Sequence, residues 1–295
     1  MTAAQVLLAW YRKHGRDLPW RHTHDAYAIL VSEIMLQQTQ VPRVILFYEK
    51  WLKQFPTWQA LANASNADVI RAWAGLGYNR RALVLRDIAR SIDATQEPKN
   101  EEEWRRLKGI GPYTAAAVSA FALHQRTLPI DTNIRRVLDR LLLGVLFPDP
   151  ALDNDLRKKT DAFLPRSGHY FDIPQALFDL ATAICTKEPN CAACPLNKLC
   201  PSAKKFLAGN VQAPKAMIKK AVEKKHAKKP HPDRIYRGRI LGLVRTRKTL
   251  TVSAVGPLID PTFQKKDDAQ WVINMIERLV KDGFLKKNNN RLTLA

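Results

Sequence analysis

The chain has 295 residues and a mass of 33.5 kDa, which is room for two or three domains. Apolar residues make up 46% and charged residues 25%, which excludes wholesale disorder, and no apolar run approaches the ~20 residues of a membrane span. The 48 Lys and Arg against 27 Asp and Glu give a net charge of +21, which favours nucleic acid as a partner over an acidic membrane surface.

Residues 1–201 are predicted to be helices joined by short loops. Apolar residues recur at three- and four-residue intervals, as amphipathic helices require, in segments 4–14, 25–38, 41–55, 67–76, 112–123 and 133–144. The first residues lack the pattern of a cleavable signal, so we expect an intracellular protein of the cytoplasm or nucleoid with no membrane partner.

Glu33 is the first candidate for chemistry. On a helix, Ile29, Leu30 and Leu36 are its neighbours at three- and four-residue spacing. A carboxylate on such an apolar stripe is desolvated and holds its proton more tightly than in water, as a general acid must. The structural alternative is a Glu at the edge of the stripe whose carboxylate reaches solvent.

The segment LKGIGPYTAAAV, residues 107–118, predicts a helix–hairpin–helix. Gly109 and Gly111 allow backbone angles that other residues resist, and Pro112 suits the first turn of the next helix. Free backbone N–H groups in the hairpin and at the helix N-terminus form an anion site, which contacts DNA phosphates without reading sequence. We expect Lys108 to contact phosphate there, and this hairpin is also the expected place for a metal ion. The alternative is an ordinary turn between two helices.

Asp131, in LPIDTNIRR, precedes a helix predicted to begin near Asn133 and is a candidate N-cap. A cap carboxylate that accepts N–H hydrogen bonds can face a developing positive charge. One protonated acid and one fixed anion are what cleavage of a glycosidic bond through an oxocarbenium-like transition state requires.

All four cysteines, Cys185, Cys191, Cys194 and Cys200, fall within sixteen residues in the spacing C-x5-C-x2-C-x5-C. A disulfide pair is the usual alternative, but an intracellular chain with no other cysteine argues against it. Four thiolates fit either a tetrahedral zinc ion or an iron–sulfur cluster. Since only Cys191 and Cys194 form a C-x2-C pair and the flanking loops are wide, the pattern favours the larger cluster.

The remainder divides into a linker and a small domain. Residues 202–234 hold ten basic residues against two acidic ones and predict a basic linker, with room for one transient helix. Residues 235–295 predict two helices, the second ended by Gly283, and then two short strands about an Asn turn. This small α+β domain is either a winged helix, with its helix in a DNA groove and its wing on phosphates, or a packing domain.

Several of these segments together resemble a known family. WYRKHGRDLPWR, SEIMLQQTQV, GLGYNRRA, LKGIGPYTAAAV, PIDTNIRRVLDR and FDLATAICTKEPNCAACPLNKLC occur in the order found in A/G-specific adenine DNA glycosylases of the MutY type, members of the helix-hairpin-helix base-excision superfamily. The resemblance covers roughly residues 5–201. It implies an all-α, two-lobed glycosylase: a six-helix domain at about 20–125, and a cluster domain from 1–19 plus 126–201 that binds a [4Fe-4S] cluster through the four cysteines.

The reaction that the resemblance implies is base excision repair by a monomeric DNA N-glycosylase. It would hydrolyse the N-glycosidic bond of adenine mispaired with guanine or 8-oxoguanine in double-stranded DNA, after the adenine leaves the stack. Glu33 would protonate the purine at N7 and Asp131 would stabilise the sugar cation, assisted by Tyr113 and Asn133. Because related strand-nicking enzymes carry a lysine at the position of Tyr113, the expected activity is monofunctional.

Further residues match binding positions of the family. Arg16, Trp20, Arg21 and Leu36 match the adenine pocket, and Gln38 and Thr39 match contacts to the opposite strand. Leu76 and Tyr78 match the wedge that fills the vacated space, an apolar device that also kinks DNA. Loop packing is the alternative for these last two residues.

The sequence departs from the family in places. The first cysteine gap is one residue short, Ala181 replaces a usual glycine, and Thr132 follows Asp131 where glycine is usual. Nothing in 202–295 resembles the Nudix-type domain that recognises oxidised guanine. The competing interpretations are a thymine or uracil mismatch glycosylase, a bifunctional pyrimidine glycosylase/lyase, which Tyr113 disfavours, and a non-catalytic iron–sulfur DNA-binding protein.

Overall fold

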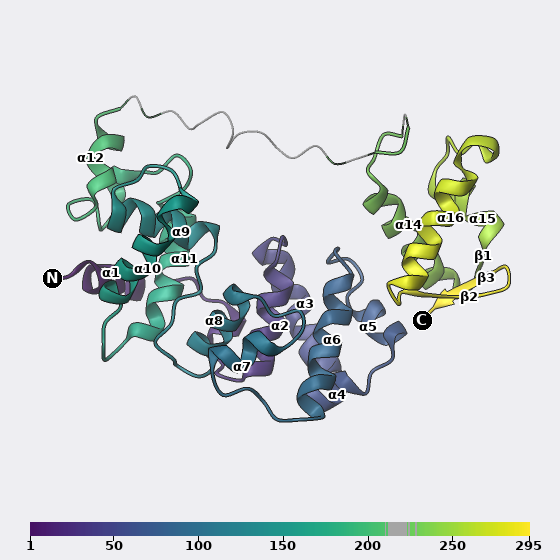
Figure 1. Ribbon diagram of the computed structural model, residues 1–295, viewed down its shortest axis with the longest axis horizontal. Coiled ribbons are helices and arrows are strands. Elements are labelled where there is room, and N and C mark those ends of the chain that lie inside the picture. Colours follow the sequence, from purple (N-terminus) through teal and green to yellow (C-terminus); the bar gives the residue numbers. More distant parts are fainter. Residues whose placement is uncertain (210, 212–222, 224, 228) are drawn as a thin grey trace. The chain divides into compact units, whose positions relative to one another are not determined.

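The computed structural model describes residues 1–209, 211, 223, 225–227 and 229–295, and these are mostly helical (Figure 1). The helices are α1 (Ala3–His14), α2 (Ala26–Leu36), α3 (Val41–Gln54), α4 (Trp58–Ala62), α5 (Asn66–Ala72), α6 (Arg80–Asp93), α7 (Glu101–Arg106), α8 (Pro112–Phe121), α9 (Thr132–Leu138), α10 (Asp153–Phe163), α11 (Ile173–Ala183), α12 (Pro201–Leu207), α14 (Asp233–Arg247), α15 (Val252–Ile259) and α16 (Lys265–Lys281). The strands are β1 (Leu250–Thr251), β2 (Leu285–Asn288) and β3 (Arg291–Leu294). The predicted fold class, all-α with a small C-terminal α+β part, is confirmed.

The helices begin where the sequence supplies caps. Thr2 and Gln5 form a capping box at the start of α1, and Asn100 accepts the backbone N–H of Glu103 at the start of α7. Pro112 occupies the first turn of α8, as predicted. After α9 the chain continues as a π-helical turn, Asp139–Leu143, rather than as the single helix that the periodicity predicts, and Gly144 ends it in the left-handed conformation.

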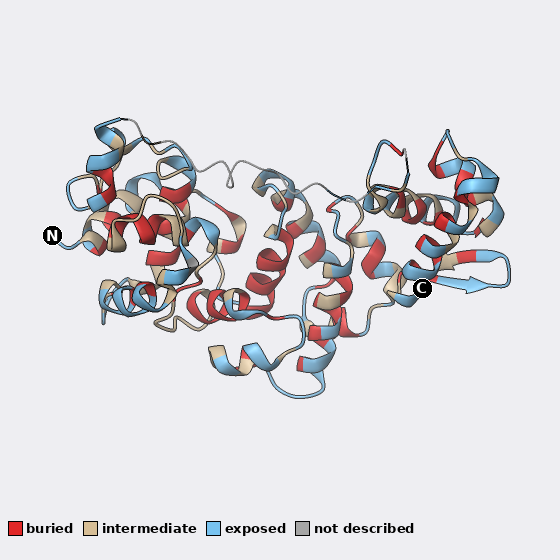
Figure 2. Cartoon of the chain, turned by 45° about the horizontal axis from the view of Figure 1, so that its top comes forward, coloured by how far each residue is buried: buried red, intermediate tan, exposed pale blue. Residues whose placement is uncertain are grey.

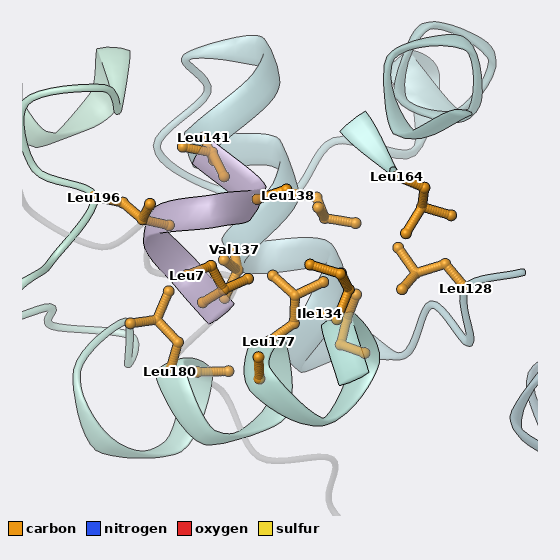
Figure 3. Packing of buried hydrophobic residues seen from close by; sticks show 14 of the residues in the cluster. Leu7, Leu128, Ile134, Val137, Leu138, Leu141, Leu164, Leu177, Leu180 and Leu196 are labelled. Atoms are coloured by element: carbon orange, nitrogen blue, oxygen red, sulfur yellow. The ribbon is translucent and has the colours of Figure 1, made fainter. Parts of the chain in front are cut away.

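The chain forms two compact units, which are described separately. The first unit comprises Met1–Glu33 with Pro98–Lys219. One hydrophobic cluster of α1, α9, α10 and α11 forms its core, with Leu7, Ile134 and Leu177 fully buried (Figure 3). Burial of a leucine side chain contributes roughly 1.5–3 kcal/mol, so this cluster ties the N-terminal helix to segments more than a hundred residues away.

The second unit comprises Ile34–Glu97 with Lys220–Ala295. Its N-terminal part is built on α3–α6, where the buried rings of Trp51 and Trp73 meet edge to face with centroids 5.3 Å apart. Its C-terminal part runs α14, β1, α15, α16, β2, β3 (Figure 1). The three strands form an antiparallel sheet in the order β1-β3-β2, with Leu250 opposite Leu292 and Leu285 opposite Leu294.

The C-terminal prediction is confirmed in part. Both predicted helices are present, Gly283 follows the end of α16 with a φ of +78°, and Asn289 has a φ of +52° in the turn between β2 and β3. The hairpin is exposed at its tip (Figure 2). Neither β1 nor α15 was anticipated, because two residues are too few for a strand pattern and Pro257 argues against a helix.

Within the second unit the C-terminal part packs on α5 and α6. Asn66 Nδ2 donates to the carbonyl of Gly283 at 2.7 Å, and Arg80 pairs with Asp282 at 3.1 Å. The buried ammonium of Lys229 lies 2.7 Å from Asp260 and 2.6 Å from Asp268. The end of the predicted linker is therefore anchored in the C-terminal part.

The predicted linker, 202–234, begins inside α12 and ends inside α14. The transient helix predicted between these helices lies largely outside the described residues. Among the residues that the structure describes, no helix has the length and apolarity needed to cross a membrane.

Candidate active site and cysteine centre

Glu33 lies on α2, and its carboxyl group is in the interior of the first unit. The residue is 6% exposed and accepts a hydrogen bond from the Tyr113 hydroxyl at 2.8 Å. Burial raises the pKa of Glu33 from 4.5 to about 7; the Tyr113 hydrogen bond opposes the rise and the negative charge of Asp131 adds to it. The desolvated acid predicted from the apolar stripe is present, and the solvent-reaching alternative is wrong.

Tyr113 is the second residue of α8, directly after the hairpin. Burial raises the pKa of its phenol well above 10, and the charges of Glu33 and Asp131 raise it further. The phenol therefore stays protonated near neutral pH and acts as a hydrogen-bond donor. The turn that carries the hairpin thus also positions the partner of Glu33.

Asp131 is the N-cap of α9, as predicted. Its Oδ1 accepts the backbone N–H groups of Asn133 at 2.8 Å and of Ile134 at 2.7 Å, and its Oδ2 accepts Asn133 Nδ2 at 2.8 Å. The cap holds the carboxylate in place, and its charge raises the pKa values of Glu33 and Tyr113. Glu33, Tyr113 and Asp131 therefore form one electrostatically coupled group.

A residue that the sequence analysis missed connects this group to the cysteine segment. Arg136 Nη1 and Nη2 donate to Asn133 Oδ1 at 3.2 and 3.3 Å, while its Nε donates to the Cys185 carbonyl at 2.8 Å. The chain Cys185–Arg136–Asn133–Asp131 orients the capping carboxylate. Arg136 lies one turn after Asn133 on α9, so helical spacing was the available signal.

Arg16 and Arg21, which match the adenine pocket, both bind Asp179 on α11. Arg16 Nε lies 2.6 Å from Asp179 Oδ1, and Arg21 reaches the carboxylate through Nη1 and Nη2, both at 2.8 Å. Burial favours the neutral form of Asp179, but hydrogen bonds from Arg21 and Arg16 outweigh it and hold its pKa below the ordinary value. Trp20, between them in sequence, is buried at 6% exposure. The observed role of both arginines is to fasten the segment after α1 to α11.

The hairpin 107–111 has the geometry of a tight turn between α7 and α8. Gly109 has a φ of +100°, which a residue with a side chain rarely adopts, and Ile110 N donates to the Leu107 carbonyl at 3.1 Å. Gly111 has a φ of −91°, so the prediction that it needs a special backbone angle is wrong. Lys108, Gly109 and Gly111 are all exposed, as a phosphate contact requires.

In the second unit, the residues after α2 are held by Arg81, another residue that the sequence analysis missed. Its guanidinium donates to the carbonyls of Ile34 at 2.8 Å and Met35 at 3.0 Å, and to the Thr39 hydroxyl at 3.1 Å. Arg81 therefore caps the C-terminal end of α2, where carbonyls lack partners and a cation is favoured. Leu36 is half-buried, and Gln38 is exposed with a φ of +56°.

The two predicted wedge residues differ in exposure. Leu76 is 6% exposed and packs inside the loop, whereas Tyr78 is 50% exposed with a φ of +47°. Gly77 supplies a carbonyl to both Trp73 Nε1 and Arg81 Nη2, each at 3.0 Å, which fixes the loop. Of the two side chains, Tyr78 is therefore the one that is accessible to a ligand.

The four cysteines line one small pocket together with Arg140, Ile184 and Phe206. No disulfide joins them. Arg140 Nη1 lies 3.4 Å from Cys185 Sγ and 2.6 Å from the Thr186 carbonyl, so a cation adjoins the pocket. Among the described residues no three His, Cys, Asp or Glu side chains converge closely enough for a metal ion.

The helical fold, the hairpin, the buried acid and the capping carboxylate are accompanied by a match to a known family. Residues 31–150 match the family described as HhH-GPD superfamily base excision DNA repair protein. Among solved structures, the chain is similar to a thermostable thymine-DNA glycosylase, with 28% identity, a TM-score of 0.64 and coverage of 68% of this chain and 95% of that one. Endonuclease III in a non-covalent DNA complex shares the fold, with a TM-score of 0.59 at 18% identity over 70% of this chain and 95% of that one.

Curated relatives narrow the family. The adenine DNA glycosylase of Mycolicibacterium smegmatis is 34% identical, over 98% of this chain and 94% of that protein. The adenine DNA glycosylases of Mycobacterium tuberculosis and Homo sapiens are 42% and 38% identical over 65% and 66% of this chain. In those two the match spans 64% and 38% of the relative's own length. The chain belongs to the adenine DNA glycosylase family.

Proposed function

We propose that the protein is a monofunctional DNA glycosylase that removes adenine mispaired with guanine or 8-oxoguanine. The observation that carries the proposal is the buried Glu33, whose pKa of about 7 leaves it substantially protonated at neutral pH beside the carboxylate of Asp131. A proton donor and an anion in unlike surroundings are the two groups that glycosidic cleavage requires. Family membership supplies adenine as the base.

In the proposed mechanism, the Glu33 carboxyl gives its proton to N7 of an adenine that has left the helix stack. The C1′–N9 bond then breaks, and its electron pair leaves with the neutral purine. The Asp131 carboxylate, fixed by three N–H donors, stabilises the positive charge on the sugar. A water molecule adds its oxygen to C1′, and its proton restores the acid form of Glu33.

Tyr113 supports the monofunctional assignment. A lyase of this superfamily needs an amine that attacks C1′ and forms a Schiff base, which a phenol cannot form. The hydroxyl instead donates to Glu33 Oε2 at 2.8 Å. In this proposal Tyr113 orients the acid, and Asn133 orients Asp131.

The proposed DNA contacts lie on exposed turns. The N–H groups of the hairpin 107–111 and the N-terminus of α8 would bind a backbone phosphate together with Lys108. Tyr78, exposed on its loop, would enter the stack where the adenine leaves, while Gln38 and Thr39 would contact the opposite strand. The metal ion at the hairpin stays a prediction.

We propose a [4Fe-4S] cluster held by Cys185, Cys191, Cys194 and Cys200. Burial raises the pKa of Cys194 to about 11 and also raises those of Cys191 and Cys200, so these three thiolates would need a metal centre's positive charge. The four cysteines line one pocket, and their spacing, with a single C-x2-C pair and wide flanking loops, favours a polynuclear cluster over one zinc ion. The cluster's role would be to order the loop 185–200 beside Arg136 and Arg140.

Metal content tests the cluster. We expect a brown protein with about four iron atoms per chain, as four cysteine ligands of one cluster require, and loss of the colour in Cys194→Ser. A matched control is Ser202→Ala, because Ser202 lines the same pocket but supplies no thiol to a metal. A colourless protein with one zinc per chain would refute the iron assignment.

The C-terminal part is proposed to be a winged helix. Its order of helix, strand, two helices and hairpin, with β1 pairing on β3, supports this interpretation. The exposed Lys286 and Lys287 of the hairpin would then contact phosphates.

Base release tests the proposed activity. The protein is incubated with duplexes that contain A·G, A·8-oxoG, T·G or U·G, and strands are analysed with and without alkali. We expect adenine release and breakage only after alkali. Breakage without alkali would contradict the monofunctional assignment. Release of thymine but not adenine would instead favour the activity named for the thymine-DNA glycosylase to which the fold is similar.

A further inference from the structure

The second unit contains a cavity of about 770 Å³ that takes no part in the proposed chemistry of base release. One wall is the loop 75–81 with the segment after α2. Residues of α14 and of the end of α16 also line the cavity, so the C-terminal part contributes to the lining. Six arginines line it, against a single acidic residue, Asp282: Arg43, Arg80, Arg81, Arg234, Arg237 and Arg278.

Local anions balance only part of this charge. Arg80 pairs with Asp282 at 3.1 Å and Arg234 pairs with Glu223 at 2.6 Å. Within the described part of the chain, Arg43, Arg81, Arg237 and Arg278 have no carboxylate in ion-pair range, although Arg81 donates to backbone carbonyls. Four guanidinium groups without a carboxylate partner around one cavity repel one another, and an anionic ligand would relieve that repulsion.

Arg237 gives an independent indication of a missing ligand. Its Nε is buried, and it has no hydrogen-bond partner among the described residues. A buried donor without a partner is energetically costly and rare in folded proteins. Because Arg237 lines the cavity, its guanidinium is available to a group that enters there.

The loop 75–81 and the segment after α2 have an unusual backbone. Gly75, Gly77, Tyr78 and Gln38 all have positive φ values and all line the cavity. Non-glycine residues in this conformation cluster at binding sites. The Arg81 guanidinium lies 5.6 Å from the centroid of the half-exposed Tyr78 ring, which joins a stacking surface to the cationic lining.

We propose that this arginine cavity binds the phosphodiester backbone of duplex DNA, so that α14 and α16 form part of the DNA-binding surface. The proposal rests on the proposed function in taking DNA as the polyanion. Guanidinium groups pair with phosphate oxygens through two parallel N–H donors, and phosphate contacts fix register without reading sequence. The C-terminal part would thereby hold the strand next to Tyr78.

Two glycines on α14 offer a matched test. A Cβ at Gly238 or at Gly242 would meet no atom within 4 Å, so either position has room for a side chain to begin. Gly238 lines the cavity, whereas Gly242, one turn further along, does not. Gly238→Glu and Gly242→Glu therefore have the same net charge and the same gain in helix propensity, and they differ in where the carboxylate lies.

The measurement is the affinity for a fluorescently labelled, fully paired duplex over a series of KCl concentrations. We expect Gly238→Glu to bind about tenfold more weakly at low salt and to flatten the plot of log K against log[KCl] by about one unit, as removal of one phosphate-binding cation does. Gly242→Glu should keep the slope of the parent. Equal effects in both variants, or none in either, would overturn the proposal.

A second pair of variants removes positive charges instead of adding a negative one. Arg237→Gln/Arg278→Gln should lower the slope by about two, one for each phosphate that is no longer neutralised. The control Lys50→Gln/Lys53→Gln removes two exposed charges from α3, away from the cavity, and should change the slope less. The duplex contains no mismatch, so these results do not depend on base release. A protein that releases no adenine can still bind through the cavity, and an active glycosylase can fail this test.

Discussion

At the scale of single residues, the central feature is that one carboxyl is buried and the other is a helix cap. Glu33 and Asp131 have the same functional group, but Glu33 is 6% exposed with one hydrogen bond from Tyr113, whereas Asp131 accepts three N–H donors. The environment therefore assigns the proton to Glu33 and the charge to Asp131. This division is what permits one side chain to act as acid and the other as stabilising anion.

The first prediction concerns pH. Since Glu33 must be protonated to act, kcat/KM for adenine release should fall as pH rises through about 7, and then about tenfold for each further unit. The Tyr113 hydrogen bond lowers the pKa of Glu33, so Tyr113→Phe should move this basic limb to higher pH. Steady-state rates between pH 5 and 9 measure it.

Tyr170→Phe is the matched control for that experiment, because its hydroxyl donates to the His124 carbonyl and does not contact Glu33. The limb should stay in place in this variant. A limb that is also unmoved in Tyr113→Phe would contradict the assignment of Glu33 as the titrating acid.

The second prediction concerns stability. The folded protein holds the Glu33 proton more tightly than the unfolded chain, so this group stabilises the fold fully below about pH 4.5, and the contribution is lost as pH rises to about 7. The loss amounts to about 3 kcal/mol in the free energy of unfolding. Urea unfolding at pH 5 and pH 8 measures it. In Glu33→Gln the difference between the two pH values should shrink by that amount; an unchanged difference would show that Glu33 does not titrate with folding.

At the scale of elements, α11 holds the N-terminal segment through a charge cluster. Asp179 is 2% exposed and binds Arg21, whose side chain is 7% exposed, and Arg16. A buried pair contributes little net stability while intact, because both charges lose water, but removal of one partner leaves the other uncompensated. The cluster therefore determines which segments pack together.

The third prediction follows from this cluster. Asp179→Asn should lower the free energy of unfolding by about 3–5 kcal/mol, because the Arg21 guanidinium stays buried without its anion. Urea unfolding monitored by circular dichroism measures it. Asp172→Asn is the control: its carboxylate is 36% exposed and pairs with His169, so it should cost at most about 1 kcal/mol. Similar losses in both variants would contradict the structural role given to Asp179.

For the molecule as a whole, part of the excess positive charge lies in a segment that has few acidic residues of its own. Residues 202–234 carry ten basic residues and two acidic ones, so most of these side chains have no anion nearby in sequence. Lys229 is held from elsewhere in the chain, since its ammonium lies between Asp260 and Asp268 at 9% side-chain exposure. This contact anchors the basic segment on the C-terminal part.

The fourth prediction tests that anchor. Lys229→Met leaves the buried Asp260 without a cation and leaves Asp268 only the His226 ring at 3.5 Å, and we expect α15 and α16 to be destabilised by about 3–5 kcal/mol. Hydrogen–deuterium exchange of peptides from 265–281 should speed up, while peptides from α9 and α11 keep their protection. Arg71→Met, which removes an exposed partner of Asp68, is the control and should leave exchange unchanged. Unchanged exchange in Lys229→Met would contradict the anchor.

Most helices, the Asp131 cap, the Gly283 stop and the Asn289 turn were predictable from the sequence. Each depends on residues within a few positions of one another, and the chemistry of a cap or a turn is local. Features that depend on residues far apart in the chain were not predicted for the same reason. The π-helical turn after α9, for example, packs against α10 and α12, which come later in the chain.

Local sequence patterns identified the groups that could do chemistry: a carboxyl on an apolar stripe, a capping carboxylate, a hairpin and four clustered thiols. Folding was needed to show that Tyr113 donates to Glu33 across 80 positions, that Asp179 holds both Arg16 and Arg21, and that four arginines of the cavity lack a carboxylate partner among the described residues. Desolvation and Coulomb interactions depend on distances through space. Packing sets these distances, and they cannot be read from the spacing of residues along the chain.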